Sequence, residues 1–270
     1  MTGSLHPDRR RVLAGLTTAG LTAAGLSAAA LSGCARTPRD PRQVVIGASP
    51  TGVPFSYVDP VSNRLTGAMV DIAATLCARL GLVADFRVVP FAALVPSLTT
   101  GRIDLIAAAM LRTPARENLV AFSAPVFAYA GGVAMRGDDV ARCPDLAALR
   151  GRRVGGQIGT RFIDQLHDAG IDRVVTYQGL GDMLRDLAHG RIDAAYGDEP
   201  ILRTILRVGP RWHLRLATDF RSPGKEPLCL IGRKAAPLIP RIDAALAGPA
   251  RSGIAPILHR WGLDEGVGTA

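Results

Sequence analysis

Strand patterns and helix patterns alternate along most of the chain, and this alternation constrains the fold more than any other feature. Residues 44–49 (VVIGAS) are a short β-branched run that ends in turn residues, which is typical of a buried strand. Residues 67–81 place apolar side chains three and four positions apart, which predicts an amphipathic helix. Two more strands and a helix between them are predicted at residues 84–90, 104–110 and 91–101. This order predicts an α/β fold with a parallel sheet covered on both faces.

A second unit further along the chain repeats the alternation of strands and helices. Its predicted strands are residues 152–157, 174–179 and 193–198, and its predicted helices are residues 160–170, 180–190 and 199–209. Residues 131–138 predict a strand that leaves the first unit, and residues 227–234 predict one that returns. The last two helices, 238–248 and 253–263, have no strands of their own and should cover the first unit. Two lobes joined by two crossing strands would leave a cleft, and such clefts bind small ligands.

The N-terminal 33 residues predict an export signal. Three arginines, Arg9, Arg10 and Arg11, precede a stretch rich in Ala, Leu, Gly and Thr that ends in LSGC. A membrane anchor is the alternative, but a spanning helix needs about 20 strongly apolar residues. The arginines resemble a twin-arginine signal, although they also fit an ordinary basic region. LSGC resembles a bacterial lipobox, which would make Cys34 a lipidated first residue.

The net charge of +9 does not indicate a nucleic-acid-binding protein. Arginines are scattered along the whole chain, the only lysines are Lys225 and Lys234, and no aromatic-rich platform accompanies the basic residues. Apart from Cys34, the widely spaced Cys77, Cys143 and Cys229 predict neither a disulfide framework nor a metal site. Cys77 should be a core residue. The sequence leaves undecided whether Cys143 and Cys229 form a disulfide bridge.

Six segments together resemble the periplasmic solute-binding proteins of polar amino-acid ABC transporters, the family 3 type with a two-strand hinge. The segments lie in the family's order at residues 47–73, 91–118, 120–126, 151–160, 189–200 and 229–238. The resemblance implies a two-lobe fold of type II, a ligand in the cleft between the lobes, and delivery to a permease in the inner membrane without chemistry. It implies no cofactor and no metal, and we expect a monomer.

This resemblance, together with the pattern of elements, predicts the organisation of the chain. The predicted parts are a signal peptide at 1–33, a lipid-anchored linker at 34–42, a first lobe at 43–130 and 233–263, a second lobe at 131–232 and a tail at 264–270. The protein should lie in the periplasm or on the outer face of the cell membrane, held by lipid on Cys34.

Arg116 is the predicted receptor for the carboxylate of the ligand. Thr113-Pro114 breaks an apolar run, so a short helix can carry Arg116 back over the carboxyl edge of the sheet, where open α/β folds bind ligands. A guanidinium matches a carboxylate with two parallel hydrogen bonds. The alternative is a solvated arginine paired with Glu117 or another surface acid. In the second lobe, the strand-to-helix turn at Gly159, Thr160 and Arg161 should offer backbone N–H groups to the same carboxylate, unless it is an ordinary turn capped by Thr160.

Asp198 is the predicted partner of the ligand's ammonium, because it ends a strand where the family carries a carboxylate. Its alternative role is the N-cap of the following helix. Other predicted contacts are Ser49, Gly52, Phe91, Ala108, Ala109 and Leu111. Relatives often carry hydroxyl, acidic or aromatic residues at several of these positions. Their loss predicts a ligand that is an amino acid or a related carboxylate, and not a basic one.

Two other classes of function stay open. Some periplasmic dehydratases that act on prephenate-like acids share this fold, and Asp198 or Glu199 could serve as their general acid. A ligand-sensing lipoprotein is the other alternative.

Overall fold

The computed structural model describes residues 40–249 and 251–263. The predicted signal, Cys34 and the predicted tail lie outside these residues. Within the described ranges, no helix has the length and apolar character that crossing a bilayer requires.

The first lobe is built on a five-stranded sheet with the order β5-β1-β6-β14-β7. These strands are β1 (Gln43–Ala48), β5 (Val83–Val88), β6 (Leu105–Ile106), β7 (Val120–Phe122) and β14 (Ile231–Arg233). A small three-stranded sheet of β2 (Thr51–Gly52), β3 (Ser56–Val58) and β4 (Leu65–Thr66) follows β1. The strands of the small sheet have only two or three residues each, too few to show a periodic pattern in the sequence.

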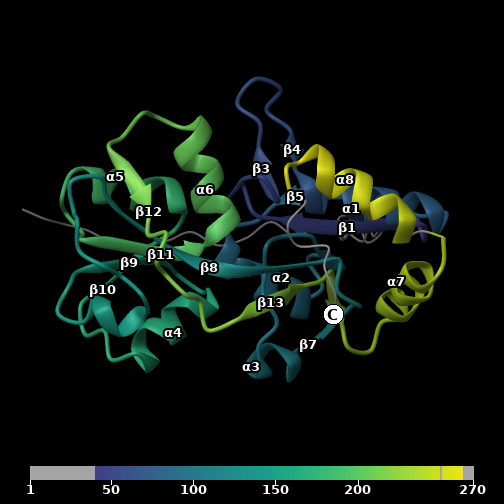
Figure 1. Ribbon diagram of the computed structural model, residues 1–270. Helices are drawn as coiled ribbons and strands as arrows, with labels where there is room; N and C mark the ends of the chain where they lie inside the picture. The colour runs from purple at the N-terminus through teal and green to yellow at the C-terminus, as the bar shows by residue number, and fades with distance from the viewer. Residues whose placement is uncertain (1–39, 250, 264–270) are drawn as a thin grey trace, which may run out of the picture. The chain divides into compact units, whose positions relative to one another are not determined.

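Helices cover both faces of the first sheet, as Figure 1 shows. They are α1 (Ala68–Arg79), η1 (Phe91–Ala93), α2 (Leu94–Thr99), α3 (Pro114–Glu117), α7 (Leu238–Ala247), η3 (Arg251–Gly253) and α8 (Ile254–Arg260). Residues of α1, α7 and α8 belong to one buried apolar cluster, whereas η1 and α2 belong to another. The helix α7 packs against β14 and α1, and α8 packs against α1, so the last two helices lie on the first unit.

The second lobe contains a sheet with the order β10-β9-β11-β8-β12, to which β13 is added through β8. Its strands are β8 (Phe127–Arg136), β9 (Val154–Gln157), β10 (Val174–Tyr177), β11 (Ala194–Asp198), β12 (Leu214–Leu216) and β13 (Lys225–Leu228). Its helices are η2 (Leu146–Leu149), α4 (Arg161–Asp168), α5 (Leu180–Ala188) and α6 (Glu199–Val208). In Figure 1, β8 and the antiparallel β13 run together between the two sheets.

Two predictions about strands need correction. Both main sheets are mixed rather than parallel, because β14 runs antiparallel to β6 and β7, and β8 runs antiparallel to β11. The crossing strands enter each sheet without a helical crossover, which allows the reversed direction. The predicted strand 104–110 shrinks to Leu105–Ile106, since Met110 donates its N–H to the Ala108 carbonyl in a tight turn. The predicted boundaries of the lobes stay predictions.

Cys77, Cys143 and Cys229 are all free and buried, so the structure has no Cys143–Cys229 bridge. Burial raises the pKa of each thiol to about 11. The thiols are therefore protonated at neutral pH and are poor nucleophiles.

Candidate ligand-binding site between the lobes

The short helix α3 carries Arg116 to the contact between the two lobes. Thr113 caps this helix by accepting a hydrogen bond from the backbone N–H of Arg116, and Pro114 occupies its first turn. The guanidinium donates through Nη1 to the carbonyl of Leu111 and through Nη2 to the carbonyl of Gly159, at 2.6 Å. Gly159 belongs to the second lobe, so one side chain bonds to both lobes.

The alternative pairing of Arg116 with Glu117 is wrong. The Glu117 carboxylate lies 3.4 Å from Nε of Arg112 instead. Burial lowers the pKa of Arg116, and the nearby Tyr129, Asp164 and Asp198 oppose this effect. A guanidinium has five N–H donors, and the two carbonyls use two of them, which leaves donors for a carboxylate.

The turn between β9 and α4 forms the opposite wall of the contact. Gly159 adopts a positive φ of 76°, and its carbonyl points at Arg116. Thr160 occupies the N-cap position, but its hydroxyl donates to the Gln157 carbonyl at 2.7 Å and accepts nothing from the helix. The alternative in which Thr160 caps the helix is therefore wrong, because its hydroxyl bonds to the carbonyl of Gln157 within the turn.

Arg161 binds a carboxylate of the protein itself. Its Nη2 lies 3.0 Å from Oε1 of Glu226 on β13. The ion pair connects α4 to a crossing strand, and it neutralises the charge of Arg161.

Asp198 ends β11 and occupies the N-cap position of α6, yet it makes no side-chain bond to that helix. It is only 2% exposed. Its Oδ1 accepts the hydroxyl of Tyr129, and that hydroxyl also lies 3.2 Å from the Ala109 carbonyl. Burial raises the pKa of Asp198 from 3.8 to about 6, against the opposing effects of Tyr129, its own backbone N–H and Arg116.

The other predicted contact residues divide into two groups. Ser49 and Gly52 lie at the carboxyl end of β1 and in β2, where the Ser49 hydroxyl is 3.5 Å from that of Thr51. A methyl group added to Gly52 would lie 3.6 Å from Cδ1 of Ile201 in the second lobe. Gly52 therefore belongs to the contact between the lobes.

The second group contributes side chains to the core. Phe91 and Ala108 belong to the buried cluster on the α2 face of the first sheet, and Ala109 and Leu111 belong to the other cluster. Only the carbonyls of Ala109 and Leu111 reach the groups around Arg116 and Asp198. Tyr129 was missed by the sequence analysis, although a tyrosine in an apolar strand requires a partner for its hydroxyl.

The match to a family model decides the classification. The model of the bacterial extracellular solute-binding proteins, family 3, matches residues 44–262. The chain belongs to this family. The histidine-binding periplasmic protein of Salmonella typhimurium is 35% identical over 164 residues, which cover 59% of this chain and 62% of that protein. The match thus spans less than two thirds of that relative.

Two further comparisons agree with this classification. ABC transporter arginine-binding protein 1 of Escherichia coli is 28% identical over 178 residues, which cover 66% of this chain and 71% of that protein. Among solved structures, a variant of ArgBP from T. maritima superposes with a TM-score of 0.75 at 28% identity, covering 82% of this chain and 95% of that one. The two-lobe, type II architecture of family 3 is therefore the architecture of this chain.

Replacing Gly159 with leucine should hold the lobes apart. A Cβ at Gly159 would lie 3.2 Å from Cα and Cβ of Ala92, and the positive φ adds about 1–2 kcal/mol of backbone strain. We expect a larger radius of gyration in small-angle scattering. Gly190→Leu is the matched control, because Gly190 has a φ of 70° with open space around it. Equal radii for both variants would contradict the contact.

Proposed function

We propose that this protein is the extracytoplasmic substrate-binding component of an ABC importer and captures an amino acid or a related small carboxylate between its lobes. The observation that carries the proposal is the placement of Arg116 and Asp198. They come from different lobes, carry opposite charges and lie close enough for the guanidinium to lower the pKa of the carboxyl. A zwitterion presents the complementary pair of charges.

The carboxylate of the amino acid would accept hydrogen bonds from the remaining N–H donors of Arg116 and from backbone N–H groups of the turn at Gly159. Its ammonium would bind Asp198 and the carbonyl of Ala109. Burying an ammonium is costly unless a carboxylate and hydrogen-bond acceptors surround it, and this position supplies both. In this proposal the protein acts as a monomer, delivers the amino acid to a permease in the inner membrane, and is held outside that membrane by lipid on Cys34.

The proposed ligand is not basic. A basic amino acid has a second cation at the end of its side chain, here called the distal cation. Ser49 and Gly52 offer no carboxylate to it. Glu199 cannot replace it easily, because its Oε1 already accepts from Arg203 at 2.6 Å. A distal cation would lose its hydration without a partner, which selects against it.

A thermal-shift panel of amino acids and related carboxylates tests this proposal. A ligand at 100 times its dissociation constant stabilises the folded state by about 2.7 kcal/mol, which raises the melting temperature by several degrees. We expect apolar, amide or acidic compounds to give larger shifts than arginine, lysine and histidine. A leading shift with a basic amino acid would overturn the proposed selectivity, and no shift with any compound would overturn the proposed function.

A dehydratase is the second candidate, and the environment of Asp198 favours it. A buried carboxyl with a pKa of about 6 is partly protonated near neutral pH and can act as a general acid. Incubation with prephenate, followed by the absorbance of an aromatic product, separates the two functions. Product formation that Asp198→Asn abolishes would identify an enzyme.

A further inference from the structure

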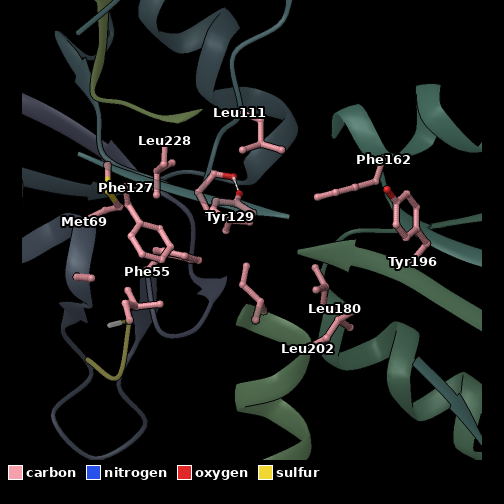
Figure 2. Close-up of a cluster of buried hydrophobic side chains, with 14 of the residues drawn as sticks. Phe55, Met69, Leu111, Phe127, Tyr129, Phe162, Leu180, Tyr196, Leu202 and Leu228 are labelled. Atoms are coloured by element: carbon pink, nitrogen blue, oxygen red, sulfur yellow. Dashed lines mark hydrogen bonds between the residues drawn. The ribbon is translucent and has the colours of Figure 1, made fainter. Parts of the chain in front are cut away.

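Tyr129 bridges the two groups that we assign to the ammonium of the ligand. Its ring is 3% exposed and stacks on Phe55, with centroids 5.2 Å apart. Figure 2 shows Tyr129 in the same apolar cluster as Phe55 and Phe127. Packing therefore fixes the ring, and the ring in turn fixes the hydroxyl between the carboxylate of Asp198 and the carbonyl of Ala109.

The hydroxyl has one proton and two neighbouring acceptors. A hydrogen bond to a carboxylate is roughly twice as strong as one to a neutral carbonyl, so the proton belongs on the side of Asp198. The two oxygens of a carboxylate have about four acceptor sites, so the Asp198 carboxylate and a lone pair on the hydroxyl oxygen can accept further N–H donors. An ammonium has three such donors, and the Ala109 carbonyl lies beside the same hydroxyl.

We propose that Tyr129 is a positioning residue of the ligand site, whose hydroxyl keeps the carboxylate of Asp198 ionised and oriented for an ammonium group. This inference rests on the proposed function. Tyr129 acts through Asp198: a hydrogen bond to the charged form of a carboxyl favours that form. Without the hydroxyl, burial would still raise the pKa of Asp198, and only its own backbone N–H and Arg116 would lower that pKa.

The charges around this pair come from four elements. Burial raises the pKa of the Tyr129 hydroxyl, and Glu226 on β13 raises it further. Arg116 on α3 favours the ionised carboxylate of Asp198. On α4, Asp164 raises the pKa of Arg116 and Arg161 lowers it. Asp198 itself makes the largest charge contribution to Tyr129, which keeps the tyrosine protonated and therefore a donor.

A carboxyl titration of the ligand-free protein tests the proposal. The Asp198 signal is followed by ¹³C NMR and assigned through its loss in Asp198→Asn. We expect a higher pKa for Asp198 in Tyr129→Phe than in the wild type, because the variant keeps the ring and removes only the hydroxyl. Tyr177→Phe is the matched control, since it removes a second tyrosine–aspartate bond, 3.0 Å to Asp186, away from the site. An unchanged pKa in Tyr129→Phe would overturn the proposal.

Binding of L-glutamine supplies the second readout. At neutral pH we expect Tyr129→Phe to bind it about tenfold more weakly, the effect of losing a hydrogen bond to a charged group. The pH below which binding disappears should also rise, which a purely structural defect would not cause. Wild-type protein that binds no amino acid would overturn the proposed function, while the titration would still decide the role of Tyr129.

Discussion

Arg116→Ala is expected to weaken amino-acid binding by roughly thirtyfold or more. Truncating one partner of a buried, hydrogen-bonded charge pair costs about 2–5 kcal/mol, and about 1.4 kcal/mol is a factor of ten. The substitution also removes the bond between Nη2 and the Gly159 carbonyl, so the two lobes lose a direct connection. Calorimetry with the leading compound of the thermal-shift panel measures the effect.

Two further variants test whether the loss of affinity depends on the guanidinium of Arg116. Arg116→Lys keeps the charge but loses the two-pronged geometry, and it should recover only part of the affinity. Arg150→Ala removes another arginine that binds a carbonyl, that of Ala169 at 2.9 Å, on the exposed surface of the second lobe. Arg150→Ala should bind like the wild type. An affinity of Arg116→Ala within a factor of two of the wild type would remove Arg116 from the site.

Asp198→Asn should bind amino acids poorly and yet unfold at a higher temperature near neutral pH. The pKa of Asp198 is about 6 in the folded protein, above its ordinary 3.8, because burial disfavours the charge. The folded state therefore holds this proton more tightly than the unfolded state. The contribution of Asp198 to stability is fully present below about pH 4 and is lost as the pH rises through 6. Asparagine carries no charge, so the variant avoids a loss of about 3 kcal/mol.

Denaturant unfolding across this pH range measures the difference between Asp198→Asn and the wild type. The advantage of the variant should be largest near neutral pH and should shrink toward pH 4. Asp186→Asn is a control with the opposite sign, since Arg191 and Tyr177 hold the pKa of Asp186 below its usual value. Its loss of stability should appear near neutral pH and fade on acidification. A pH-independent difference for Asp198→Asn would contradict its buried charge.

Local patterns predicted the helices well. The three-and-four spacing in residues 67–81 predicted α1, observed at Ala68–Arg79, because one apolar face of a helix is visible within a single segment. The order of elements also predicted that α7 and α8 return to the first lobe. Direction within a sheet has no such local signal, so the antiparallel placement of β8 and β14 was missed.

In the candidate site, too, local patterns could be predicted and contacts between distant segments could not. Arg116 and Asp198 could be selected because Arg116 follows a predicted strand and Asp198 ends one, at the edge where such folds bind ligands. Tyr129 could not, since its partner lies 69 positions away in the sequence and its neighbours are apolar. The pairing of Arg161 with Glu226 likewise depends on how α4 packs beside a crossing strand. Contacts between distant segments became apparent only in the folded chain.

The three buried thiols have a consequence for how this protein is made. Cys77, Cys143 and Cys229 are buried as free thiols, and none of them requires an oxidant to reach its final state. The described fold can therefore form completely in a reducing cytoplasm, before the chain meets an oxidising compartment. A recombinant protein that spans residues 40–270 should accordingly fold in an ordinary cytoplasmic host, with no disulfide isomerase and no refolding step.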